Sequence, residues 1–138
     1  MRKAVRAIII KGDDLLVMHR NKFGTVYDTL PGGNIEMGET PEEALFREVL
    51  EETMVEFKNP TLVFLEHSDD IYGDQYVFLC EYVGGEPRLH PESEEEHINK
   101  LGENLYTPRW LPFAELATVP FLSDKLQHML IKLSLIHI

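Results

Sequence analysis

Cysteine, basic residues and long apolar runs are all scarce in this chain of 138 residues. Cys80 is the single cysteine, so no disulfide can form within the chain, and its neighbours Phe78 and Leu79 predict a buried strand residue. This scarcity fits a reducing compartment, and we expect a cytoplasmic protein. The apolar run in the N-terminal stretch MRKAVRAIIIKGDD is too short for a signal peptide or a membrane span. We therefore expect no membrane partner.

Basic residues are few compared with acidic ones. The chain has 13 Lys and Arg residues and 24 Asp and Glu residues, which gives a formal net charge of −11. This balance argues against a broad nucleic-acid-binding surface. It does not exclude phosphate substrates, because bound metal ions can bridge an acidic site to a phosphate. The alternative explanation of the charge is solubility alone.

The chain has no internal repeat and no low-complexity linker, and its 43% apolar residues suffice for a packed core, so we expect one domain over residues 1–138. Apolar and β-branched runs bounded by turn residues predict strands at 3–10, 15–20, 27–30, 61–67, 75–83 and near 110–111. Helices are expected at about 40–54, 112–116 and 123–133, whereas residues 90–104 are acidic and irregular. Strands interrupted by a few helices are typical of an α/β or α+β fold.

The most clearly marked element is the helix that begins at Thr40. Thr40 and Glu43 form a capping box, in which each side chain bonds the other residue's backbone N–H, and Pro41 suits the first helical position. The apolar residues of this helix fill an arc that we expect to face a core: Leu45, Phe46, Val49 and Leu50.

Three glutamates share the neighbouring arc of the same helix. At about 100° per residue, Glu48, Glu51 and Glu52 fall within roughly 100° of one another. Three like charges there weaken a helix unless a cation lies among them, and hard divalent ions such as Mg²⁺ prefer these oxygen ligands. Gly32 and Gly33 in the preceding loop allow a backbone carbonyl to turn toward the same ion. The alternative is a solvated, charged helix face.

These residues stand at fixed spacings. Gly33, Glu39, the run Arg47-Glu48-Val49 and the pair Glu51-Glu52 resemble the signature of the Nudix hydrolases, the MutT-like pyrophosphohydrolases. The family usually has glycine two residues after the last glutamate pair, where this chain has Met54. Because methionine is a poor choice for a left-handed position, we expect an unstrained backbone at Met54. The resemblance implies a Nudix-type α/β/α sandwich with a mixed β-sheet.

The resemblance also implies roles for individual residues. It assigns Glu48, Glu51 and Glu52 to metal binding, with Glu48 also a candidate base, and it makes the Gly32 carbonyl a further ligand. Arg47 would orient a glutamate through an ion pair, a task that suits a bidentate guanidinium. The implied cofactor is Mg²⁺, with Mn²⁺ as the alternative.

Nudix enzymes commonly add a carboxylate from a loop outside the signature. Glu103 is favoured here, because its position fits the approach to the strand near Trp110. An ordinary solvated loop is the alternative for each candidate: Glu94, Glu95, Glu96 and Glu103. Tyr72 is the candidate substrate-binding residue, as an aromatic platform for a base, and a tyrosine half-buried on the sheet is the alternative. The six histidines show no metal-ligand spacing.

Two hypotheses about function follow. The first is a metal-dependent hydrolase that cleaves the phosphoanhydride of a nucleoside diphosphate linked to another moiety, with a small nucleotide as its partner. The second is a non-catalytic Nudix domain that binds a nucleotide as a sensor; such domains usually lose one or more signature carboxylates, and this chain keeps all of them. The apolar residues 133–138 are expected to extend the last helix. The alternative is packing against a partner chain, which leaves a homodimer open.

Overall fold

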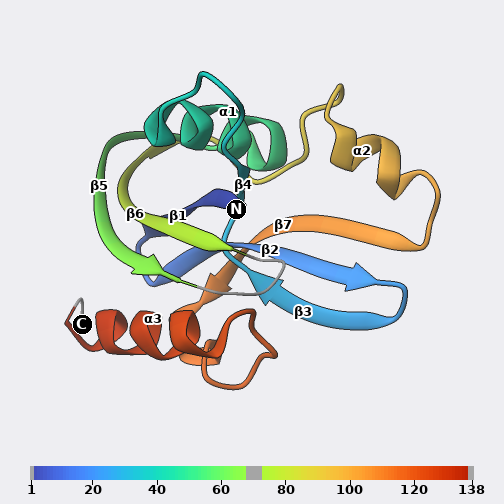
Figure 1. Ribbon diagram of the computed structural model, residues 1–138. Helices are drawn as coiled ribbons and strands as arrows, with labels where there is room; N and C mark the ends of the chain where they lie inside the picture. Colours follow the sequence, from blue (N-terminus) through green and yellow to red (C-terminus); the bar gives the residue numbers. More distant parts are fainter. Residues whose placement is uncertain (1, 68–72, 137–138) are drawn as a thin grey trace.

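The computed structural model describes residues 2–67 and 73–136. The elements in chain order are β1 (Lys3–Lys11), β2 (Asp14–Lys22), β3 (Thr25–Thr29), β4 (Gly32–Asn34), α1 (Pro41–Thr53), β5 (Glu56–Glu66), β6 (Asp74–Gly84), α2 (Glu94–Asn99), β7 (Asn104–Pro112), the 3₁₀ turn η1 (Phe113–Glu115) and α3 (Asp124–Ile136). Figure 1 shows the sheet between α1 and α3, with α2 beyond β7 on the α1 side. The predicted fold class, an α/β/α sandwich with a mixed sheet, is confirmed.

The sheet divides into two parts because β1 and β2 separate. β1 pairs in parallel with β6 and antiparallel with its other neighbours. β1 and β2 are paired only at Ile10↔Leu15 and Lys11↔Asp14, whereas β4 pairs with β1 over Ala4–Arg6. We call β4, β1, β6 and β5 the β1 wing, and β7, β2 and β3 the β2 wing. One of the cavities described below is lined by residues of both wings.

Apolar side chains point alternately to the two faces of the sheet, and one apolar core lies on each side of it. Val5, Ala7 and Ile9 of β1 are fully buried in the core beneath α1, whereas Ile8 lies in the core that includes α3. Successive strand residues point to opposite faces, so one strand supplies both cores. Cys80 is buried in the first core, as predicted, and burial raises the pKa of its thiol to about 12. None of the helices in the described part of the chain is long and apolar enough to cross a membrane.

The acidic stretch predicted as irregular contains a short helix, α2. The Ser93 hydroxyl accepts a hydrogen bond from the Glu96 N–H at 3.1 Å and so begins the helix. At its other end, the Asn99 side chain bonds both the N–H (2.7 Å) and the carbonyl (2.8 Å) of Tyr106 in β7. These bonds reach across seven residues of chain, so local pattern alone did not reveal them.

Two of the four residues expected to face the core are about half exposed. Leu45 and Val49 are fully buried, but Phe46 is 45% exposed and Leu50 is 48% exposed. Phe46 instead stacks on Phe57 of β5, with ring centroids 4.3 Å apart. The core stripe of α1 is narrower than predicted, because β5 ends the sheet on that side and no further element among the described residues covers the outer helix face.

The backbone at Met54 differs from the sequence expectation. Met54 has φ 56° and ψ 17°, a left-handed conformation, and its N–H donates to the Leu50 carbonyl at 3.1 Å. The prediction of an unstrained backbone was therefore wrong. The helix still ends in the geometry that glycine usually supplies, and a side chain in that conformation costs about 1 kcal/mol or more.

Met54→Gly is accordingly expected to raise the free energy of unfolding, by up to about 1 kcal/mol, because relief of the left-handed strain outweighs the added chain entropy. Met54→Ala is the matched control, since it removes the long side chain and keeps the Cβ strain. Chemical denaturation of both variants measures the difference. A glycine variant no more stable than the alanine variant would contradict the backbone explanation.

Candidate active site

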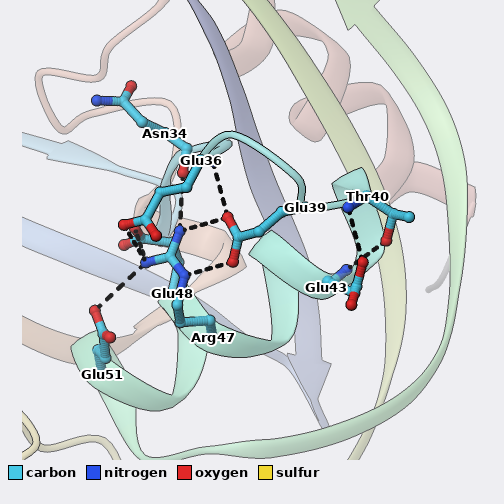
Figure 2. A network of polar contacts seen from close by, with 8 residues as sticks. All are labelled: Asn34, Glu36, Glu39, Thr40, Glu43, Arg47, Glu48 and Glu51. Carbon is cyan, nitrogen blue, oxygen red and sulfur yellow. Dashed lines mark hydrogen bonds and ion pairs between the residues drawn. The ribbon is translucent and has the colours of Figure 1, made fainter.

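Arg47 is the centre of a polar network on α1 (Figure 2). Its Nε and Nη2 donate to the two carboxylate oxygens of Glu39 at 2.7 and 2.9 Å, which is a bidentate pair. Its Nη1 donates to Glu48 Oε1 at 2.7 Å, and its Nη2 also donates to the Asn34 carbonyl at 3.0 Å. The Arg47 side chain holds the pKa of Glu39 down at about 2, with help from the Glu36 N–H. Arg47 thus ties the loop before α1 to the helix and orients Glu48.

Gly32 and Gly33 allow the loop to pass close to this helix. A Cβ on Gly33 would lie 2.5 Å from the Glu48 carboxyl carbon, and a Cβ on Gly32 would lie 1.9 Å from the Val5 carbonyl oxygen. The Gly32 N–H donates to Glu52 Oε1 at 2.8 Å. The structure therefore places the N–H of Gly32 against a signature glutamate, and the ligand role of its carbonyl stays a prediction.

The three signature glutamates differ in exposure. Glu52 is buried, at 6% exposed, and the Glu48 side chain is 13% exposed, whereas that of Glu51 is 40% exposed. Burial raises the pKa of Glu48 to about 7, although Arg47 opposes this. Burial raises the pKa of Glu52 to about 8, against the opposing Arg6 charge and the Gly32 N–H. A cation among these carboxylates would stabilise their charged forms.

The structure brings Glu95, rather than Glu103, to the signature glutamates. Glu94 and Glu95 line a cavity of about 500 Å³ together with Glu48 and Glu51. The chain is held there because the His90 N–H donates to the Glu51 carbonyl at 2.9 Å. Glu95 Oε1 is buried and has no hydrogen-bond partner in the described structure. Burial raises the pKa of Glu95, and nearby negative charge adds to this effect.

Glu103 lies elsewhere. It lines a separate hollow of about 430 Å³ with the β2–β3 turn, and its carbonyl accepts from the Phe23 N–H at 2.8 Å. The signal that could have favoured Glu95 is its place in a capped segment, since Ser93 fixes the residues that follow it. Tyr72, the candidate substrate-binding residue, lies outside the described residues.

A second cavity, of about 330 Å³, adjoins the first across Glu48 and Glu95. Glu52 contributes to its acidic side. The other side is lined by three arginines and a tyrosine, which are Arg2, Arg6 of β1, Arg20 of β2 and Tyr106 of β7. Sequence reasoning did not single out these residues. Arg6 carried a signal, because a charged residue interrupts the otherwise apolar strand run AVRAIII.

The carboxylate oxygens at this site are the kind of ligand that a hard divalent cation prefers. Glu48, Glu52 and Glu95 offer carboxylate oxygens from two elements around one cavity, and one of these oxygens is buried with no partner among the described residues. Within residues 2–67 and 73–136, no three acidic, histidine or cysteine side chains converge closely enough to enclose an ion. The reason is that Glu48 points to Arg47 and Glu52 to Gly32. Ion binding would therefore require these side chains to turn or to share their oxygens.

The chain belongs to the Nudix family, because the family model described as the NUDIX domain matches residues 1–130. The family membership predicted from the spacing of the signature is confirmed. Two solved structures share the fold. A MutT Nudix hydrolase from Burkholderia pseudomallei has a TM-score of 0.69 at 23% identity, covering 91% of this chain and 94% of that one. A structure from work on MutT of Aliivibrio salmonicida and Vibrio cholerae has a TM-score of 0.68 at 18% identity, covering 99% and 98%.

Curated relatives carry more specific names. The NAD-capped RNA hydrolase NudC of Photorhabdus laumondii subsp. laumondii is 32% identical over 113 residues, covering 80% of this chain and 39% of the relative. The ADP-ribose pyrophosphatase of Methanocaldococcus jannaschii is 36% identical over 104 residues, covering 71% and 61%. The chain spans between 32% and 39% of the length of the NudC relatives it matches.

Proposed function

We propose that this protein is a divalent-metal-dependent hydrolase that cleaves the phosphoanhydride bond of a nucleoside diphosphate linked to another moiety. The observation that carries the proposal is the meeting of Glu48, Glu52 and Glu95 around one cavity, where a buried Glu95 oxygen has no partner in the described part of the chain. The names of the relatives support it, because NAD and ADP-ribose both contain a diphosphate linked to a nucleoside.

The residues of the α1 helix hold the cofactor in this proposal. Mg²⁺ or Mn²⁺, when bound, would neutralise phosphate charge and make a water molecule more acidic. Glu51 and Glu52 would supply its carboxylate ligands, with Glu48 as the third. Arg47 limits where Glu48 can move, because the guanidinium is fixed by its bidentate pair with Glu39. Arg47 therefore orients one of the three ligands, whereas the ligand set as a whole closes only when the side chains turn toward the ion.

Glu95 is the proposed base. Its Oε1 is free to accept the proton of the attacking water, whereas Glu48 Oε1 already accepts a hydrogen bond from Arg47. Glu48 is the alternative base, as the family resemblance implies. The carboxyl of Glu95 comes from α2, and the ligands come from α1, so the two elements must keep their present separation for the reaction. The bond between His90 and Glu51 provides that connection.

A substrate panel tests the proposal. The purified protein should hydrolyse at least one of NAD, ADP-ribose, dinucleoside polyphosphates, nucleoside triphosphates and nucleotide sugars in the presence of Mg²⁺. A chelator should abolish turnover, and added Mg²⁺ or Mn²⁺ should restore it. Products separated by ion-exchange chromatography identify the bond that is cut. Tight nucleotide binding without turnover of any compound would instead support the sensor hypothesis.

A further inference from the structure

The arginines of the second cavity are held in an unusual way. Arg2 Nε donates to Asn34 Oδ1 at 2.5 Å, and Arg6 donates to Gln75 Oε1 at 3.0 Å and to the Leu30 carbonyl at 3.1 Å. All of these acceptors are neutral. None of the ion pairs found among the described residues involves Arg2, Arg6 or Arg20. Three positive charges therefore line one cavity, and no carboxylate among the described residues is bonded to them.

Arg20 is held by aromatic rings as well as by hydrogen bonds. Its guanidinium carbon lies 3.6 Å from the centroid of the Tyr106 ring, its cross-strand neighbour on β7, and 5.9 Å from that of Tyr27 on β3. Its Nε donates to the Leu105 carbonyl at 3.2 Å, and its Nη2 donates to the Asn104 side chain. A guanidinium has five N–H groups, so three remain without an acceptor in the described structure. The guanidinium of Arg20 is therefore held in one orientation, with these three N–H groups available to a ligand.

Arg20 lies across the same cavity from the signature glutamates of α1. Glu48 and Glu52 lie on α1, which packs on the β1 wing, whereas Arg20 and Tyr106 belong to the β2 wing. The cavity spans the gap between the wings and is lined from both sides. A substrate whose anhydride lies at the glutamates would therefore present a different part of itself to Arg20.

We infer that Arg20 is a specificity-determining residue, which binds a phosphate group of the substrate beyond the two phosphates of the scissile anhydride. This inference rests on the proposed function. A fixed guanidinium fork matches the geometry and charge of a phosphate, and stacking on Tyr106 restricts it further. The substrate class it favours is a nucleoside diphosphate whose other moiety is itself a phosphate or carries one near the anhydride.

The competing explanation is that Arg20 only offsets the charge of Glu95, on which it acts electrostatically. In that case the loss of Arg20 would affect every substrate alike, because Glu95, as the proposed base, would act on each of them. A matched pair of substrates that differ by one phosphate separates these explanations.

The first test needs no turnover. Metal-free protein is titrated with inorganic pyrophosphate in a calorimeter at low ionic strength. We expect wild-type binding, and affinity weaker by roughly 10-fold or more in Arg20→Gln. Arg88→Gln is the matched control, because Arg88 is an exposed arginine outside both cavities, and its affinity should stay within about twofold. Absent wild-type binding, or equal affinities in the two variants, would overturn the inference.

The second test compares a nucleoside triphosphate with the diphosphate of the same nucleoside. Arg20→Gln should lower kcat/KM for the triphosphate by roughly 10- to 100-fold and for the diphosphate by less than about threefold. Arg20→Lys keeps the charge without the fork, so it should give an intermediate loss and serves if the glutamine variant unfolds. Equal losses for both substrates would overturn the inference. If wild type cleaves neither compound, the hydrolase proposal fails for them, and the pyrophosphate titration still decides the role of Arg20.

Discussion

Glu52→Gln should lose roughly 10²-fold or more of the metal-dependent turnover and still fold. The glutamine keeps the size of the side chain and an oxygen that can accept from the Gly32 N–H, but it lacks the charge that holds the cation. Because Glu52 is buried, removal of its charge should not lower the melting temperature. Steady-state kinetics with Mg²⁺, together with Mn²⁺ binding followed by electron paramagnetic resonance, measures both effects.

Glu51→Gln is expected to behave in the same way, since it removes a charge from the same edge of α1. Glu42→Gln is the matched control, because Glu42 lies in the first turn of the same helix, is exposed and lines neither cavity. Unchanged magnesium-dependent rates in both Glu51→Gln and Glu52→Gln would overturn the metal assignment.

Glu95→Gln should slow turnover by roughly 10²-fold, the usual size of a general-base contribution, with little change in melting temperature. The amide fills the same space and cannot take the proton from water. Glu103→Gln should stay within about twofold of wild type, because Glu103 lines a separate hollow and contacts the β2–β3 turn through its backbone.

Parallel kinetics on the Gln variants of Glu94, Glu95, Glu96 and Glu103 provide the comparison. A slow Glu103→Gln beside a normal Glu95→Gln would show that the loops rearrange around the substrate and that the position favoured by the sequence holds the role. If all four variants keep wild-type rates, the α1 glutamates supply every catalytic carboxylate.

Some features of this fold follow from local sequence signals, whereas others depend on packing between distant residues and could not be predicted. The start of α1 was predictable because Thr40, Pro41 and Glu43 act within one turn, and both capping-box bonds are present at 2.9 and 3.1 Å. The exposure of Phe46 and Leu50 was not predictable, because it depends on where β5 ends the sheet. The left-handed backbone of Met54 was missed for a related reason, since residue preference yields when the surrounding structure fixes the path of the chain.

By itself, the sequence determined the family, the capped helix and the set of glutamates on one helical edge, because fixed spacing on a regular helix converts directly into a shared face. Only the tertiary structure decided which partners meet that face. The cavity beside Glu52 is lined from both β1 and β2, the bond from His90 to Glu51 brings Glu95 close, and the pairing of β2 with β7 places Arg20 on Tyr106. These contacts join residues far apart in the chain, and no local pattern encodes the register and loop path that create them.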